Sequence, residues 1–263
     1  MLTATIPAAA ALMIGLPLVL ALAITRRLGT PLSLVAWGAA VFLLAQALRL
    51  PSLQALTSLF AQGALPVPDP ANQIAVNIAI LSITAGLFEE GARYLAYRYM
   101  IPRARSWNAA VTFGAGHGGM ESVALGGLMA FELSTMLSLG APGTTPLPGQ
   151  SPEEHARLTE QVMRYWATPW YVPLLGALER VFSICFHLTM AVVVLEAVRR
   201  SNLAWLLAAM AAHAAANAAA TATMVAYGPV AAEIVVGLFA ALAVYGLFRL
   251  RRGNGETQRQ AAA

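Results

Sequence analysis

The chain of 263 residues is poor in charge and in cysteine, and it has no lysine at all. Charged residues make up 11% of the sequence, less than half of the roughly 25% that is typical of a soluble domain. The single cysteine, Cys185, excludes an internal disulfide and a thiolate metal cluster. No arginine-rich stripe carries interleaved aromatics, which argues against nucleic-acid binding. The G-x-S-x-G and P-loop patterns are also absent.

The sequence contains long apolar runs in place of charged residues. Hydrophobic residues account for 59% of the chain, and a transmembrane helix needs about 20 mostly apolar residues. The sequence predicts an all-α, polytopic membrane helix bundle of about seven transmembrane helices. The expected spans are 6–25, 31–50, 73–99, 106–135, 169–198, 202–224 and 228–249. Together they would form one domain over residues 1–252, followed by a disordered polar tail at 253–263.

Three stretches between the spans have a different character. Residues 53–65 are typical of an interfacial helix, and a proline-rich turn follows them. Residues 140–152 are rich in proline and glycine and predict a loop. Residues 153–166 are charged and predict a surface helix.

Arginine is concentrated at alternate ends of the expected spans. One side collects Arg26, Arg27, Arg103, Arg105, Arg199, Arg200, Arg249, Arg251 and Arg252. The positive-inside rule then places the N-terminus outside and the C-terminus in the cytoplasm. Because no basic region precedes the first apolar run, we expect an uncleaved first helix. These features predict an integral membrane protein, with the bacterial cytoplasmic membrane as its expected location.

Ten polar side chains interrupt four of these spans. They are Glu89, Glu90, Arg93, His117, Glu121, Glu179, Arg180, His187, His213 and Asn217. Burying such groups in lipid is costly, so they are expected to face one another or a watery cavity. With about 1.5 Å of rise per residue, the histidines of three spans (His117, His187 and His213) each lie roughly 16 Å from the cytoplasmic end. The sequence therefore predicts one polar layer near the midplane.

These residue types can together hydrolyse an amide without a covalent intermediate. Two adjacent carboxylates, Glu89 and Glu90, supply a general base, and a neighbouring histidine can orient the attacking water. Arg93 can hold the second carboxylate ionised. His213 and Asn217, spaced i,i+4, can donate hydrogen bonds to the oxyanion of a tetrahedral intermediate.

At these residues the chain resembles a known superfamily. The motifs Glu89-Glu90-Gly-Ala-Arg93, Phe113-Gly-Ala-Gly-His117 and His213-Ala-Ala-Ala-Asn217 are similar to those of the type II CAAX prenyl endopeptidase (CPBP/Abi) superfamily. The run Gly116-His-Gly-Gly-Met-Glu-Ser122 is similar to the YhfC-type membrane peptidase branch.

The resemblance implies an intramembrane glutamic protease without a cofactor. Glu89 would be the base assisted by His117, Glu90 would pair with Arg93, and His213 with Asn217 would form the oxyanion hole. The superfamily form has three residues between the glutamate pair and arginine, and this chain has two. That spacing leaves open which glutamate Arg93 holds, and hence which is the base.

Two alternatives remain open. His117, His187 and His213 could bind zinc in a metal-dependent intramembrane protease, although an H-E-x-x-H motif is absent. Glu121 and His187 are possible additional site residues under either mechanism. The same helices could also form a non-enzymatic scaffold or a proton-linked carrier. The expected partners are the lipid bilayer and a membrane protein or peptide substrate.

Overall fold

The computed structural model describes residues 1–139 and 151–261, with side chains up to Arg251. The described residues form helices and no strand, which confirms the all-helical fold class. The helices are α1 (Leu2–Leu28), α2 (Ser33–Ala61), α3 (Gln73–Leu95), α4 (Trp107–Ser138), α5 (Pro152–Trp166), α6 (Val172–Arg199), α7 (Ala204–Tyr227) and α8 (Pro229–Ala261). The short π-helix η1 (Ala96–Met100) continues α3. The loop expected at 140–152 lies almost wholly outside the described residues.

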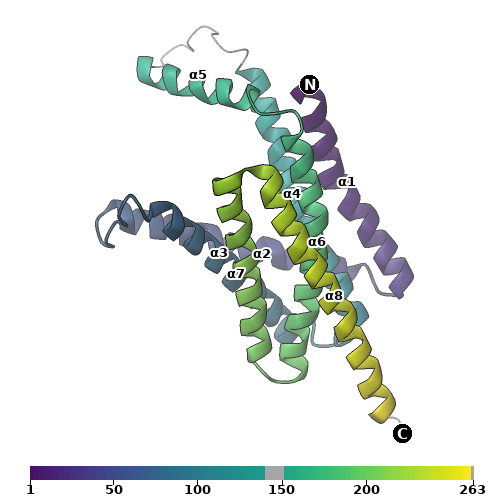
Figure 1. Cartoon of the computed structure of the whole chain (residues 1–263). Helices are drawn as coiled ribbons and strands as arrows, with labels where there is room; N and C mark the ends of the chain where they lie inside the picture. The colour runs from purple at the N-terminus through teal and green to yellow at the C-terminus, as the bar shows by residue number, and fades with distance from the viewer. Residues whose placement is uncertain (140–150, 262–263) are drawn as a thin grey trace.

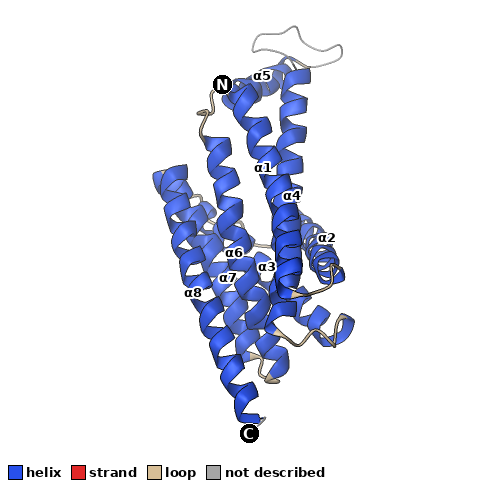
Figure 2. Ribbon diagram, turned by 90° about the vertical axis from the view of Figure 1, so that its right-hand side faces the viewer, coloured by secondary structure: helices blue, strands red, loops and turns tan. Residues whose placement is uncertain are grey.

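The helix α6 is the central element of the bundle. It packs against α1, α3, α4, α7 and α8. In its most apolar stretch 67% of the residues are buried, against 28–33% in the other apolar helices. Figures 1 and 2 show α6, α7 and α8 running side by side, with the two chain termini at opposite ends of the bundle. A side chain on α6 is therefore well placed to meet groups from several helices.

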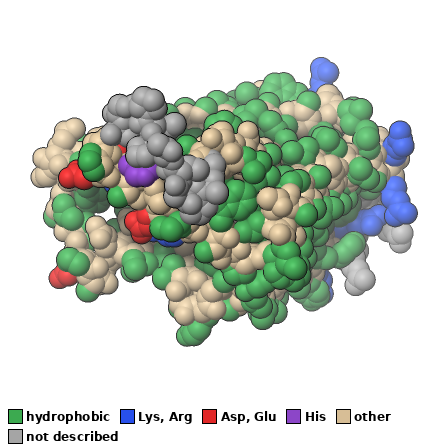
Figure 3. All heavy atoms as spheres, turned by 90° about the horizontal axis from the view of Figure 1, so that it is seen from above, with side chains coloured by type: hydrophobic (Ala, Val, Ile, Leu, Met, Phe, Trp, Pro, Cys, Tyr) green, Lys and Arg blue, Asp and Glu red, His purple; other side chains and the backbone are tan. Residues whose placement is uncertain are grey.

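Five of the described helices are long and apolar enough to cross a membrane: α1, α2, α3 with η1, α6 and α8. The helices α4 and α7 are also long, at 32 and 24 residues, but they are not among these five. In Figure 3 hydrophobic side chains cover much of the visible face, with arginine gathered at one edge and acidic groups at the other. The seven-span count and the orientation stay predictions.

Two expected boundaries differ from the structure. The helix α2 continues through Pro51 to Ala61, so the span expected to end at residue 50 and the interfacial helix after it are one helix. Proline removes only one backbone donor, and long helices tolerate it where neighbouring groups compensate. The helix α8 continues to Ala261, past the expected end of the last span at residue 249, and the extent of the domain stays a prediction. The tail contains no proline that would end it.

The charged segment at 153–166 is the helix α5, as expected. Ser151 caps its N-terminus by accepting a hydrogen bond from the Glu154 backbone N–H, and the Glu154 side chain accepts one from the Ser151 backbone N–H. This reciprocal arrangement satisfies two backbone donors at the start of the helix. At the other end, Tyr165 and Trp166 pack near Leu2 of α1 and Leu133 of α4. Figure 1 shows α5 lying across one end of the bundle.

Candidate active site

Glycines let the site-bearing helices approach one another closely. A Cβ atom on Gly38 of α2 would lie 2.0 Å from the Phe113 carbonyl oxygen of α4, and one on Gly116 would lie 2.0 Å from the Val35 carbonyl oxygen. Real Cβ atoms do not reach such distances, so α2 and α4 can cross here only because both positions lack a side chain. This crossing places α2 directly beside His117.

The same device joins the other helices that carry the polar residues. A Cβ atom on Gly118 of α4 would lie 2.9 Å from the His187 Cβ atom on α6. A Cβ atom on Gly86 of α3 would lie 2.5 Å from the Met210 carbonyl oxygen on α7. These two contacts bring α4 against α6 at His187, and α3 against α7 near His213. The glycines that the sequence presents as small packing residues therefore set the geometry of the site.

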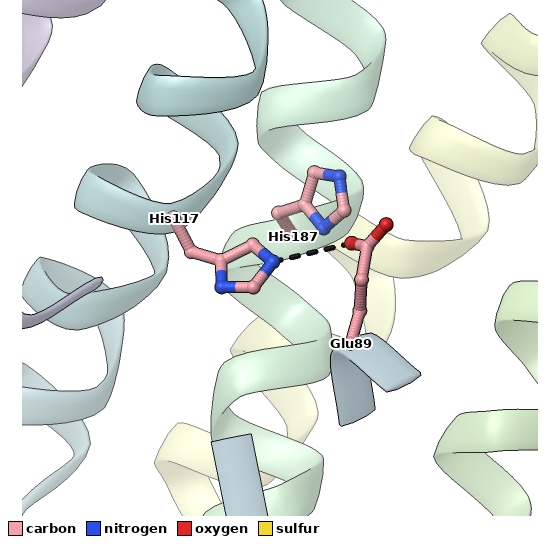
Figure 4. Close-up of side chains that lie close together, drawn as sticks. All are labelled: Glu89, His117 and His187. Carbon is pink, nitrogen blue, oxygen red and sulfur yellow. Dashed lines mark hydrogen bonds and ion pairs between the residues drawn. The ribbon is translucent and has the colours of Figure 1, made fainter. Parts of the chain in front are cut away.

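Glu89, His117 and His187 form the tightest group of possible ligands. One donor atom from each lies within 4.8 Å of the other two, and all three residues are buried. The His117 Nε2 atom lies 3.1 Å from the Glu89 Oε2 atom. Figure 4 shows the His117 and His187 rings on two helices converging on the Glu89 carboxylate. The structure therefore brings three of the residues expected in the polar layer into one contact cluster.

Glu90, Arg93 and His213 form a second cluster beside the first. The Arg93 Nη1 atom donates to Glu90 Oε1, and His213 Nδ1 lies 2.7 Å from the same oxygen. Glu90 and Arg93 have no exposed surface. Arg93 Nη2 lies 3.8 Å from Glu89 Oε2, so Arg93 holds Glu90 directly and Glu89 at longer range. The structure thus decides the pairing that the shortened motif left open.

Glu121 on α4 connects His187 to a third set of polar groups. His187 Nε2 lies 2.6 Å from Glu121 Oε2 and donates its proton to the carboxylate. Ser183 donates to the same oxygen at 3.0 Å, and Arg180 donates to Glu121 Oε1 at 3.0 Å. Arg180 also pairs with Glu179. Because Nε2 carries the proton, the lone pair of His187 is on Nδ1, where Arg93 Nη2 donates to it at 2.6 Å.

Among the described residues, Asn217 makes no side-chain hydrogen bond to these clusters. Instead it lines a cavity of about 70 Å³ together with Glu121, His187 and His213. A cavity needs only about 10–15 Å³ to hold one water, so this cavity can hold several. The amide of Asn217 and the imidazole of His213 therefore border a space in which a water or a substrate carbonyl can lie.

Gln46 on α2 is a site residue that sequence reasoning missed. Its Nε2 atom donates to Glu89 Oε1 at 3.1 Å, and Arg49 donates to its Oε1 atom at 3.4 Å. Arg49 also donates to Thr84 and to the Leu81 carbonyl on α3. The spacing of Gln46 and Arg49, two polar residues on one face of an apolar run, was the available signal.

Some buried polar atoms of the site have no hydrogen-bond partner among the described residues. They include Glu90 Oε2, Arg93 Nε and His117 Nδ1. Such atoms are costly in a structural core and are common where a ligand or water completes the network. Two imidazoles and a carboxylate are the donor set of catalytic zinc sites that keep one open position. The residues present therefore fit a divalent metal, with Glu89 grouped with His117 and His187 in place of the expected His213.

The fold and the site define a polytopic helical membrane protein with a buried glutamate, histidine and arginine cluster. Residues 12–240 match the family described as YhfC intramembrane metalloprotease, and the chain belongs to this family. It is similar to the uncharacterized membrane protein YhfC of Bacillus subtilis (strain 168), with 32% identity over 175 residues, which cover 65% of this chain and 67% of that protein. No solved structure matches.

Proposed function

We propose that the chain is a metal-dependent intramembrane protease in which Glu89, His117 and His187 hold the metal ion. The observation that carries this proposal is the approach of their three donor atoms to within 4.8 Å in a buried layer. The family description, intramembrane metalloprotease, supports the same reading. When bound, a divalent ion supplies Lewis acidity toward water and toward a carbonyl group.

The residues around the group have roles that their contacts support. Glu121 orients His187 by accepting its Nε2 proton, which is the carboxylate–histidine arrangement that fixes a ligand tautomer. Gln46 orients Glu89 by donating a hydrogen bond from its Nε2 atom to the Glu89 Oε1 atom. His213 and Asn217 border the 70 Å³ cavity. There the Asn217 amide can donate to the oxyanion of a peptide under attack, and His213 can donate from Nε2 when it is protonated on both nitrogens, since its Nδ1 atom contacts Glu90.

Arg93 is the residue that separates this proposal from a metal-free mechanism. Its Nη2 atom donates a hydrogen bond to His187 Nδ1. A metal ion bound by His187 would use the same Nδ1 lone pair. Metal binding therefore requires Arg93 to move away from His187, while its hydrogen bond to Glu90 can remain. In the metal-free candidate the contact persists, Glu89 acts as the general base, and His117 orients the water through its 3.1 Å contact with Glu89. The contact between His117 and Glu89 is the observation that favours the metal-free mechanism.

The substrate class follows from the place of the site. The cluster is enclosed by apolar helices, so we infer that the substrate is a transmembrane or membrane-proximal peptide segment. The order of the three motifs supports a place in the CPBP/Abi superfamily. The cytoplasmic membrane of a bacterium is the proposed location.

Metal content and cleavage together test the proposal. The purified full-length protein is reconstituted in nanodiscs, its metal is counted by elemental analysis, and cleavage of single-span transmembrane peptides is followed by mass spectrometry. We expect about one divalent ion per chain, and its loss in Glu89→Gln and His117→Gln. Glu196→Gln is the matched control, because Glu196 is buried on α6 but pairs with Arg199 and Arg200 away from the cluster.

The outcomes discriminate among the candidates. Cleavage that persists without bound metal and in the presence of chelators would reject the metal-dependent mechanism and support the glutamic mechanism. Bound metal without cleavage of any peptide, or neither property, would favour a scaffold or a proton-linked carrier. A carrier would also show solute flux that responds to a proton gradient.

A further inference from the structure

A second cavity, of about 250 Å³, lies between the start of α6, the end of α7 and the start of α8. It reaches toward the α7–α8 turn, at the opposite end of these helices from Arg199. Three of its lining residues, Glu179, Ala220 and Val236, also line the 70 Å³ cavity beside His187 and His213. The two cavities therefore adjoin, and they extend from the α7–α8 turn to His187 and His213.

Glu233 on α8 is the residue of this outer cavity that the site described above does not use. It is 9% exposed, and its Oε2 atom has no hydrogen-bond partner among the described residues. It also lines the cavity. A buried carboxylate oxygen without a partner is costly, and water or a bound cation in the adjacent space removes that cost. This unsatisfied atom is the second observation, besides the cavity itself, that indicates an occupant.

The charge around the joined cavities is unbalanced. Arg180 is the buried guanidinium that borders them, and it already pairs with Glu121 and Glu179. Glu233 adds a third carboxylate without adding a cation. Acidic groups in a cavity with apolar walls attract cations and repel anions, because the low-dielectric walls focus the field.

Small side chains leave this space open. Gly176 of α6, Ala216 and Ala220 of α7 and Ala232 of α8 border the two cavities. The alanine-rich run of α7 therefore does more than allow close packing, because on one face it leaves a passage. A larger cavity at the far end of the bundle, near Thr30 and Pro102, shares no lining residue with the histidine cavity.

We propose that the joined cavities form a hydrated, cation-selective vestibule that leads water and small inorganic cations, including the metal ion, to the histidine and glutamate cluster. Its use for metal and water supply rests on the proposed function. Its hydration and charge preference do not, and they can be measured on protein that has neither metal nor activity.

Thiol accessibility tests the vestibule directly. Cys185 is the only cysteine of the chain, so Cys185→Ser provides a cysteine-free background. In that background Ala216→Cys and Ala220→Cys are reacted in nanodiscs with a cationic and an anionic methanethiosulfonate, and rates are divided by those for a free thiol. Ala215→Cys is the matched control, because Ala215 neighbours Ala216 on α7 but is exposed and lines neither cavity.

We expect both cavity thiols to react. The control thiol should stay unreactive, because an exposed position on the predicted span α7 that lies outside both cavities faces lipid, where a thiol does not ionise. The normalised rate for the cationic reagent should exceed that for the anionic one by about tenfold or more. The substitution Glu233→Gln should reduce this ratio severalfold while keeping the thiols reactive. Cavity thiols as inert as the control would overturn the hydration, and a ratio near one, or one that Glu233→Gln leaves unchanged, would overturn the selectivity.

A metal-uptake measurement separates this inference from the proposed function. Zinc is added to metal-free protein, and binding is followed by competition with a chromogenic chelator. We expect Glu233→Gln to slow uptake severalfold and to leave the final stoichiometry unchanged. Unchanged uptake kinetics would remove the supply role. If the protein binds no zinc, but its cavity thiols react and do so faster with the cationic reagent, the metal proposal is rejected and the vestibule is supported.

Discussion

The imidazole of His187 on α6 donates from Nε2 to the carboxylate of Glu121 on α4 across 2.6 Å. This bond joins the central helix to the neighbour that also carries His117, and it leaves the Nδ1 lone pair of His187 to accept the hydrogen bond from Arg93 Nη2. The position of one carboxylate thereby decides which nitrogen of His187 carries the proton and which carries the lone pair.

Glu121→Gln is expected to weaken metal binding without abolishing it. An amide can accept the Nε2 proton but lacks the charge that fixes the tautomer and raises ligand basicity. Loss of such outer partners typically costs 10–100-fold in affinity, so we expect a Kd for zinc raised by about that factor. Competition titration measures it. An unchanged Kd, with Glu196→Gln as control, would show that Glu121 does not support the ligand.

Gln46→Leu is expected to affect the same site through Glu89. The substitution keeps the size of the side chain but leaves Glu89 Oε1 without the donor on α2. Losing a hydrogen bond to a charged group costs about 1–3 kcal/mol, and we expect that decrease in the free energy of unfolding together with weaker zinc binding. Denaturant titration in detergent measures the first. Gln46→Glu should be worse still, because it sets two carboxylates side by side.

Gly116→Ala is expected to separate α2 from α4. The added Cβ atom would meet the Val35 carbonyl at 2.0 Å, which requires a backbone shift. Overpacking of this kind costs about 1–3 kcal/mol, and it should also move His117 away from Glu89. Thermal unfolding measures the cost. Gly127→Ala is the matched control on the same helix, since nothing lies within 4 Å of its added Cβ atom, and it should be neutral or slightly stabilising.

The capping box of α5 predicts a pH response outside the membrane spans. Hydrogen bonds from the Ser151 backbone N–H and hydroxyl group lower the pKa of Glu154 below its usual range. A lowered pKa in the folded state means that the stabilisation is present at neutral pH and is lost as pH falls through the folded-state pKa. Hydrogen exchange over 151–166 should therefore lose protection at acidic pH. Glu154→Gln should make the helix start insensitive to pH, and a persisting response would contradict this account.

The alternation of apolar runs and arginine-bearing ends was enough to predict a helical membrane protein. The i,i+4 spacings of His213 with Asn217 and of Glu89 with Arg93 are local properties that the chain itself carries. The structure is consistent with both, since a helix places such residues on one face whatever surrounds it.

The contacts that each side chain makes on other helices could not be predicted from the spacing of residues in the sequence. Spacing within one helix says nothing of how that helix is rotated against its neighbours. The rotation is set where glycines such as Gly116 and Gly118 let backbones touch, and these contacts join residues far apart in the chain. For this reason the sequence grouped His213 with the other histidines, whereas the fold pairs His213 with Glu90 and sets Glu89 beside His117 and His187. Gln46 was missed for the same reason.

The sequence by itself indicated a helical membrane protein whose apolar helices carry acids, imidazoles and an amide, because hydropathy and helical periodicity are local properties of the chain. Tertiary structure alone decided which of them meet, which partner each nitrogen of His187 has, and where a cavity reaches them. Those properties depend on helix rotation and close packing between distant segments.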